Sequence, residues 1–333
     1  LQLKQKIMGR IFLFVLLFVC LSWKTGNAQN AVAPATGDGT IENPYQIASL
    51  ENLYWISQTT SSWTKSFIQT ADIDATQTST WNQGAGWVPI GDYNTRFKGK
   101  YNGKGHVIDG LTINRPTTNT QALIGYMEAA TVDSLGLTNV NIKGAMQVAA
   151  LCANQTAYYN TATQSFVESK IRNCYATGKV IAGSQNVGGL VGSSMSYGLI
   201  SNSFFIGEVS GGSFVGGLCG SNTSNSTISN CFSAGTVTGS GQKIGGLVGY
   251  NEQAYVYFSY SNCTVNGGST GKYVGGLVGM NDNTIATLID KCYATGNVSG
   301  NELIGGLVGN NLYGGVKNSY ATGNVSATKY AGG

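Results

Sequence analysis

Short apolar runs separated by glycine and asparagine recur along the chain, and almost none of them follows the 3.6-residue period of a helix. A clear example is the segment 171–180, in which β-prone residues are followed by a Thr-Gly pair and then by Val180. Each unit of the chain contains two or more such runs. This pattern predicts short β-strands joined by tight turns.

A glycine motif divides the chain into repeats. Gly-Gly-Leu-Val-Gly, or a near copy, occurs five times at steps of 28, 29, 30 and 30 residues, and a sixth copy opens at Gly332. Degenerate copies begin at Gln121 and Ala149, and the 39-residue step from Ala149 to the next copy indicates an insertion of about ten residues within 154–170. We assign a structural role to the paired glycines of the five copies, which are Gly188 and Gly189, Gly216 and Gly217, Gly245 and Gly246, Gly275 and Gly276, and Gly305 and Gly306.

A repeat of this size cannot bury its apolar face alone, whereas stacking each repeat on the next buries the apolar residues of both. The sequence therefore predicts an all-β, right-handed parallel β-solenoid of 28–30-residue repeats over 97–333. Paired glycine allows close backbone approach, and the Leu and Val of the motif are expected to fill the core. Two residues after the last glycine of four copies stands an asparagine, which predicts a turn with a ladder of amides. These residues are Asn222, Asn251, Asn281 and Asn311.

One aromatic residue occupies the same position in six successive repeats. Because its size and apolarity are constant, we interpret this column as an inward ladder that fills the core; the alternative is an outward platform for sugar rings. The residues are Tyr175, Phe204, Phe232, Tyr260, Tyr293 and Tyr320.

The repeats closely resemble GLUG repeats, which are named for the Gly-Leu-any-Gly core found here at Gly189-Leu190-Val191-Gly192. The Asn-Cys/Ser-aromatic-Ala-Thr-Gly element matches as well, while Ala149-Ala150 and Cys263 depart from the pattern. GLUG repeats occur in bacterial surface adhesins and in non-catalytic regions of immunoglobulin A peptidases. The resemblance implies an envelope or extracellular protein, and it supplies no shared ligand residues.

The ends of the chain differ from the repeats. Residues 1–28 have the basic start, short apolar run and small residues at 26 and 28 that are typical of a secretory signal, and the run is too short to span a membrane. Residues 29–96 are expected to form an N-terminal cap, with a short helix that begins after Ser49 and continues through Ser57. Because the chain stops inside a motif at Gly333, we expect it to be a fragment of a longer protein, truncated at its C-terminus.

Charge excludes one class of partner. Without residues 1–28 the chain has 15 basic and 15 acidic residues, so the basic surface required for nucleic-acid binding is missing. His106 is the only histidine, which excludes a complete histidine-based metal site, and Asp72 with Asp74 is weak evidence for calcium. We expect neither a metal nor another cofactor, and no membrane span in the mature chain.

Catalysis in a β-solenoid requires carboxylates that converge on neighbouring coils. The acids after residue 171 are assigned to different positions of the repeat, so we predict that the chain is not an enzyme. They are Glu208, Glu252, Asp282, Asp290 and Glu302. Six cysteines remain after the signal, and their spacing places in-register partners two coils apart, beyond disulfide reach. We therefore predict free, buried thiols.

Binding is the function that remains. Loops that interrupt a solenoid are where ligands usually bind, so the insertion is the candidate site, with Tyr158, Tyr159 and Phe166 as binding residues. The competing hypothesis is that Tyr159 and Phe166 fold inward over an edge of the core. We predict a secreted or cell-surface, adhesin-like protein with a glycan or a host or surface protein as partner. The alternative is the accessory stalk of a larger secreted enzyme.

Overall fold

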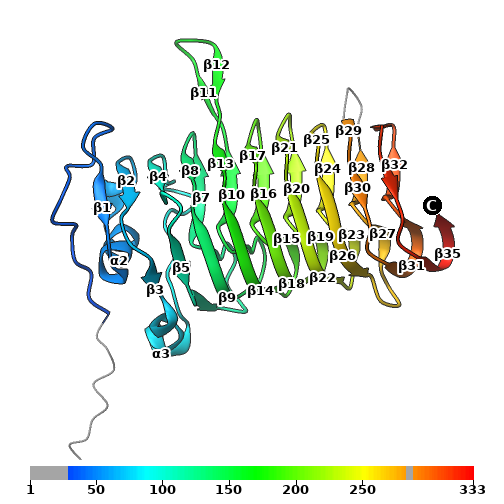
Figure 1. Ribbon diagram of the computed structural model, residues 1–333, viewed down its shortest axis with the longest axis horizontal. Coiled ribbons are helices and arrows are strands. Elements are labelled where there is room, and N and C mark those ends of the chain that lie inside the picture. The colour runs from blue at the N-terminus through cyan, green and yellow to red at the C-terminus, as the bar shows by residue number, and fades with distance from the viewer. Residues whose placement is uncertain (1–28, 283–287) are drawn as a thin grey trace, which may run out of the picture.

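Parallel strands stack in register along the length of the molecule, so that the two ends of the described chain lie far apart (Figure 1). The computed structural model describes residues 29–282 and 288–333, and the predicted signal segment lies outside them. Gly188, Gly216, Gly245, Gly275, Gly305 and Gly332 pair in succession along one column, by which we mean equivalent positions in successive coils. The predicted parallel β-solenoid is confirmed.

Each regular coil contains four strands, which belong to three sheets. A 10-stranded sheet contains β1 (Tyr45–Ile47), β2 (Ser66–Gln69), β4 (Lys100–Asn102), β8 (Thr131–Asp133), β13 (Lys170–Arg172), β17 (Leu199–Ser201), β21 (Thr227–Ser229), β25 (Tyr255–Tyr257), β29 (Leu288–Asp290) and β33 (Gly315–Lys317). A 7-stranded sheet contains β7 (Ile124–Glu128), β10 (Cys152–Thr156), β16 (Val191–Met195), β20 (Cys219–Thr223), β24 (Val248–Glu252), β28 (Val278–Asp282) and β32 (Val308–Leu312).

The third sheet has 16 strands and receives two strands from each regular coil. Its longer ladder contains β3 (Ile73–Asp74), β5 (Val107–Asp109), β6 (Thr112–Asn114), β9 (Gly136–Gly144), β14 (Tyr175–Ala182), β18 (Phe204–Gly211), β22 (Phe232–Gly239), β26 (Tyr260–Asn266), β30 (Tyr293–Ala294), β31 (Val298–Gly305), β34 (Tyr320–Ala321) and β35 (Val325–Gly332). The shorter ladder contains β15 (Gln185–Gly188), β19 (Ser213–Gly216), β23 (Gln242–Gly245) and β27 (Lys272–Gly275), and it joins the longer one at β31.

The motif glycines lie where backbones of neighbouring strands almost touch. A β-carbon on Gly246 would overlap the carbonyl oxygen of Gly276 and the hydroxyl of Ser261. Leu247 of the same motif is completely buried in the core. The glycines are therefore required for space, and the Leu and Val that follow them fill the interior.

The asparagine ladder exists, but it does not lie in a turn. Asn222, Asn251 and Asn281 are in strands β20, β24 and β28 and are completely buried. Each Nδ2 donates to the Oδ1 of the next asparagine, at 2.9, 2.8 and 2.7 Å, ending at Asn311. The predicted turn is wrong because a buried amide is satisfied by the identical amide above it and needs no left-handed backbone.

Left-handed backbone is found at other asparagines. Asn173, Asn202 and Asn230 have φ of 53°, 48° and 52°, and each lies two residues before the aromatic position, at the corner that precedes β14, β18 and β22. A second corner has φ near 60° at the position of Asn186 in every coil. Asparagine tolerates this conformation better than most residues, which explains its presence at the first corner.

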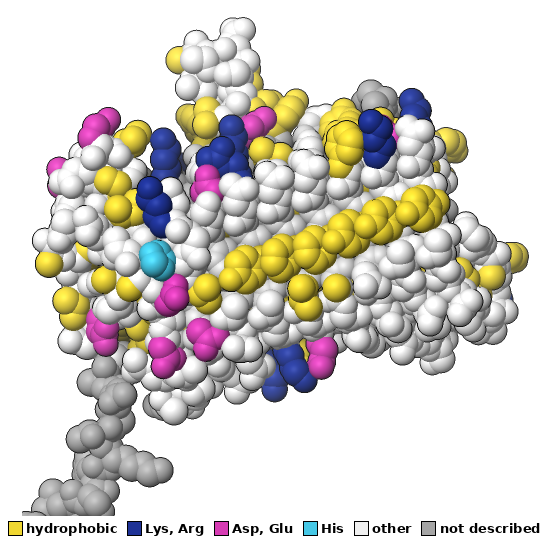
Figure 2. Space-filling model, in the orientation of Figure 1, with side chains coloured by type: hydrophobic (Ala, Val, Ile, Leu, Met, Phe, Trp, Pro, Cys, Tyr) yellow, Lys and Arg dark blue, Asp and Glu magenta, His cyan; other side chains and the backbone are white. Residues whose placement is uncertain are grey.

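The aromatic column faces outward, so the inward interpretation is wrong. The six rings form a continuous stack with centroids 4.6–5.5 Å apart and ring planes within 11° of parallel. They form the apolar ridge that crosses the face shown in Figure 2. The neighbouring position, Ala176 or Phe205, points into the core instead. Stacking on the surface thus accounts for the constant aromatic identity.

The N-terminal region, the predicted cap, lies at one end of the stack and continues it (Figure 1). Helix α2 (Leu50–Gln58) begins at the predicted N-cap, where Ser49 accepts a hydrogen bond from the backbone of Asn52 at 3.3 Å. Strand β1 pairs in register with β2, and β2 with β4, so the parallel ladder begins at Tyr45, before the predicted boundary at residue 97. The remaining helical segments are η1 (Thr60–Ser62), η2 (Thr76–Thr80) and α3 (Trp81–Gly84).

The six cysteines of the described residues are free and buried, as predicted. Burial raises the pKa of the Cys174 and Cys231 thiols to about 12 and that of Cys292 to about 11. Cys174, Cys231 and Cys292 belong to one column, in which cysteine alternates with serine from coil to coil. Ser203 and Ser259 each accept a hydrogen bond from the backbone N–H of the cysteine one coil before. A small side chain with a weakly polar tip is what the position requires.

Candidate functional site

A hairpin projects from the stack where the sequence has its insertion (Figure 1). Strands β11 (Tyr158–Asn160) and β12 (Ser165–Val167) pair antiparallel, which sets them apart from the parallel coils. The projecting part is shorter than the predicted 154–170, because Asn154 and Gln155 belong to β10 and are buried, and Lys170 begins β13.

The turn of the hairpin is fixed by local hydrogen bonds. Asn160 Oδ1 accepts from the backbone N–H groups of Ala162 and Thr163, at 3.0 and 3.3 Å. Gln164 takes a left-handed φ of 50°, and the hydroxyls of Thr163 and Ser165 are 2.8 Å apart. An asparagine that closes its own turn in this way gives the hairpin a defined shape.

Four aromatic residues lie on this hairpin and the adjacent coil, and we call them the hairpin cluster: Tyr158, Tyr159, Phe166 and Tyr197. The last three form one group of rings, whereas Tyr158 precedes Tyr159 in β11 and therefore points to the opposite face of the hairpin. The rings of Tyr159 and Phe166 are 5.0 Å apart, and Phe166 stacks on Tyr197 at 4.5 Å. Tyr158, Tyr159 and Phe166 keep 46%, 46% and 43% of their surface exposed. They do not fold inward over the core, so the competing hypothesis is wrong.

Two contacts to the cluster were not anticipated from the sequence. Tyr197 comes from the turn after β16 in the next coil and has a left-handed φ of 61°, and no spacing pattern links it to the insertion. Lys98 Nζ lies 5.7 Å from the centroid of the Tyr158 ring, within the range of a cation–π contact. Tyr159, Phe166 and Tyr197 thus present exposed apolar area with tyrosine hydroxyls, which suits binding, while Tyr158 and Lys98, which also pairs with Glu128, lie on the other face of the hairpin.

The other candidate residues of the sequence form separate local contacts. Asp72 Oδ1 lies 3.1 Å from His106 Nδ1 and accepts from the backbone of Val107, and these bonds hold the pKa of Asp72 below its usual value. Asp74 instead accepts from the hydroxyl and the backbone of Thr76, which lower its pKa as well. In residues 29–282 and 288–333 no group of three or more His, Cys, Asp and Glu could hold a metal ion.

One prediction about the acids is wrong. Glu252 and Asp282 occupy the same position on adjacent strands and pair in register. Tyr250 donates a hydrogen bond to Asp282 Oδ2 at 3.2 Å, and Lys243 Nζ lies 3.4 Å from the centroid of the Tyr250 ring. Burial raises the pKa of Tyr250, and both carboxylates raise it further. The phenol therefore stays protonated as a donor, and together with Lys243 it compensates the two neighbouring negative charges.

Comparison with known proteins agrees with the repeat pattern. The family model for the GLUG motif matches residues 183–210, 211–238, 270–299 and 300–326. Halomucin of Haloquadratum walsbyi is 35% identical over 173 residues, which are 50% of this chain and 2% of that protein. A protein of Evansella cellulosilytica named "Putative Gly-rich membrane protein" is 35% identical over 145 residues, which are 40% of this chain and 16% of that protein. The chain thus spans only a small part of each relative.

A solved structure shares the fold. The crystal structure described as "a putative immunoglobulin A1 protease from Bacteroides ovatus" superposes with a TM-score of 0.61 and 19% sequence identity, over 86% of this chain and 87% of that one. Among the residues described, no helix is both long enough and apolar enough to cross a membrane. The register of the glycine columns, the matched repeats and the shared fold together show that the chain carries GLUG-motif repeats, built as a parallel β-solenoid.

Proposed function

We propose that this chain is a non-catalytic, secreted or cell-surface repeat protein that works as an adhesin, binding a carbohydrate or protein partner through the hairpin cluster. The observation that carries the proposal is the exposed group of rings formed by Tyr159, Phe166 and Tyr197, with Tyr158 on the other face, on a hairpin that stands out from otherwise regular coils. Names of two relatives, a halomucin and a Gly-rich membrane protein, support a location at the cell surface.

Physical reasons favour the hairpin over the flat faces of the solenoid. Tyrosine and phenylalanine provide large contact areas at a low cost in side-chain entropy, and the tyrosine hydroxyls add hydrogen bonds at the rim. The coils beneath hold the hairpin in place through parallel pairing of β10 with β7 and β16. A rigid scaffold that presents one irregular loop is a common arrangement for binding.

The test is a shortened variant in which residues 157–168 are replaced by Ser-Asn, as found at Ser224 and Asn225. This replacement suits the coil because Ser226, which follows that turn, lies at the position equivalent to Ser169. We expect the melting temperature to change by only a few degrees, since the hairpin side chains are exposed. Binding to a glycan array and to immobilised mucin is expected to fall at least tenfold.

A point variant refines this test. Tyr159→Ser with Phe166→Ser should reproduce the loss of binding, whereas Tyr313→Ser, at an 83% exposed tyrosine outside the cluster, should bind like the parent chain. Unchanged binding in the shortened variant would refute the proposal. A melting temperature lowered by many degrees, with binding intact in the folded fraction, would show that the hairpin is structural.

A second candidate is the accessory stalk of a larger secreted enzyme, and the solved structure with a protease title favours it because the likeness covers most of both chains. The complete gene would separate the two candidates: a zinc-protease motif elsewhere in the product supports the stalk, and a sorting or anchoring segment supports the adhesin. The purified chain is expected to show no hydrolase or lyase activity under either candidate.

A further inference from the structure

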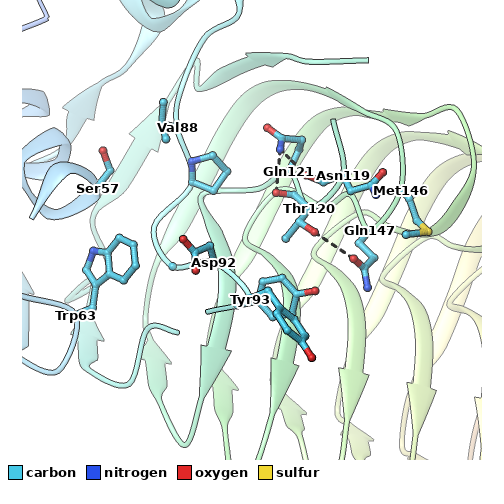
Figure 3. A pocket seen from close by; sticks show the side chains of 13 residues that line it. Ser57, Trp63, Val88, Asp92, Tyr93, Asn119, Thr120, Gln121, Met146 and Gln147 are labelled. Atoms are coloured by element: carbon cyan, nitrogen blue, oxygen red, sulfur yellow. Dashed lines mark hydrogen bonds between the residues drawn. The ribbon is translucent and has the colours of Figure 1, made fainter. Parts of the chain in front are cut away.

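We propose that a cavity between the cap and the first coils is a second binding site, which takes a neutral mono- or disaccharide. The cavity has a volume of about 620 Å³, within the usual range for small-ligand sites. Ser57 and Trp63 of the cap lie at one end, Met146 and Gln147 of the coils at the other, and the segment 88–93 lies between them (Figure 3). None of these residues belongs to the hairpin cluster, so this site does not depend on the proposed function.

The cavity exists because short side chains occupy one outer corner of the first coils. The corner is occupied in successive coils by Thr120, Gln147 and Asn186. They are at equivalent positions because the residues that follow them, Gln121, Val148 and Val187, pair in register. Further along the stack the same corner is filled: Phe214 stacks on Tyr250 at 5.5 Å, and Lys243 lies against both rings. The N-terminal coils therefore leave open a space that later coils close with their own side chains.

An aromatic wall lines the open corner. Tyr93 is 69% exposed, and its ring meets the Tyr126 ring edge to face at a centroid distance of 5.9 Å. Arg96 lies 5.7 Å from the centroid of the Tyr93 ring. A pyranose presents an apolar C–H face and a rim of hydroxyls, and it packs best where an exposed ring stands beside polar groups.

Suitable polar groups stand at the same corner. Thr120 Oγ1 donates to Gln147 Oε1 at 3.1 Å, which orients the amide and leaves its NH₂ group without an acceptor among the described residues. Asp92 Oδ1 accepts from the backbone of Asn94 and Thr95, and Oδ2 has no donor in that part of the chain. A donor and an acceptor that line the same cavity suit the hydroxyls of a saccharide, which both donate and accept hydrogen bonds.

Charge selects a neutral ligand. Asp92 is the one charged residue among the described residues that line the cavity. Arg96 and Lys98 share Glu128 at 2.6 and 2.7 Å, so these three side chains keep one net positive charge, which the Asp92 carboxylate offsets. The corner therefore has no net charge, and an anionic sugar within the cavity would face the Asp92 carboxylate, so neutral saccharides are favoured over acidic ones.

The experiment measures binding of the whole chain to a glycan array that contains neutral and uronic-acid saccharides, followed by calorimetry with the best neutral binder. Tyr93→Ala and Asp92→Asn each should weaken binding at least tenfold; the amide can still accept from Asn94 and Thr95, so the loop keeps its shape. Gln147→Phe closes the corner as Phe214 does, at a similar left-handed φ of 58° against 52°, and should abolish binding with an unchanged melting temperature.

Two comparisons separate this site from the hairpin. The variant with the shortened hairpin should retain its affinity for the neutral saccharide, and Tyr313→Ala should bind like the parent chain. The proposal is overturned if no neutral saccharide binds, if acidic saccharides bind better, if only peptides bind, or if the three cavity variants keep full affinity.

Discussion

Replacing Asn251 by alanine should destabilise the solenoid strongly, because this side chain is the centre of the buried amide ladder. Asn251 is completely buried and accepts from Asn222 Nδ2 at 2.9 Å. Its own Nδ2 donates to Asn281 Oδ1 at 2.8 Å and to the Ala254 carbonyl at 3.1 Å. The alanine variant leaves these two acceptors without that donor inside the core, while Asn222 Nδ2 keeps a longer bond of 3.3 Å to the Tyr255 carbonyl.

Each buried polar group left without a partner costs about 1–3 kcal/mol, so two of them predict a loss of about 2–6 kcal/mol in the free energy of unfolding. Denaturant titration followed by far-ultraviolet circular dichroism measures the change in the free energy of unfolding. Because repeat proteins can unfold in parts, hydrogen exchange at the coils around Asn251 tests for local unfolding.

Two variants serve as controls. Asn251→Ser should lose less, since Ser194 occupies the same column, in register with Asn222. Asn311→Ala, at the exposed end of the ladder, should lose less than about 1 kcal/mol. If Asn251→Ala is no more destabilising than Asn311→Ala, the ladder does not hold the coils together.

Two further predictions concern space and pH. Gly246→Ala should destabilise the chain by about 3 kcal/mol or more, because the added β-carbon would overlap the backbone of the next coil. Gly183→Ala should be neutral or stabilise by up to about 1 kcal/mol, because its β-carbon would meet no atom closer than 4.0 Å. Thermal melts measure both changes. Burial raises the pKa of the Cys174, Cys231 and Cys292 thiols from 9.0 to about 11–12. Their contribution to the free energy of unfolding is therefore fully present below pH 9 and is lost as the pH rises toward 12. A variant with serine at these three positions should lose less stability between about pH 9 and pH 12 than the parent chain.

The spacing of the glycine motif was enough to predict the fold, because a fixed period in sequence requires equivalent positions to lie above one another. The direction of the aromatic column was misjudged because constant size was attributed to core packing. Alternation along the strand predicts the correct direction. Tyr175 is four residues from the exposed Lys179 and therefore shares its face, while the buried Ala176 and Val180 share the other face.

The sites depended on contacts that no repeat pattern contains. Tyr197 reaches the insertion from the next coil, and the cavity joins Trp63, Tyr93 and Gln147 from three distant segments. The pairing of Glu252 with Asp282 was within reach, because their separation of 30 residues equals the local repeat. The contacts of Lys243 and Tyr250 with this pair of acids could not be predicted from the sequence, because they depend on how side chains pack at the corner.

The aromatic ridge is the most conspicuous apolar feature of the surface, yet its geometry argues against a role as a sugar platform. Its rings lie parallel and 4.6–5.5 Å apart, so each face is covered by the next ring and only the edges point outward. Sugars stack on ring faces, and among the six rings Tyr320, 56% exposed at the end of the stack, has the most open one. The ridge therefore stabilises neighbouring coils, as the asparagine ladder does from within. This is why we place the proposed recognition at the hairpin cluster and at the cavity near the cap, where side chains do not repeat from coil to coil and the rings of Tyr159 and Tyr93 are 46% and 69% exposed.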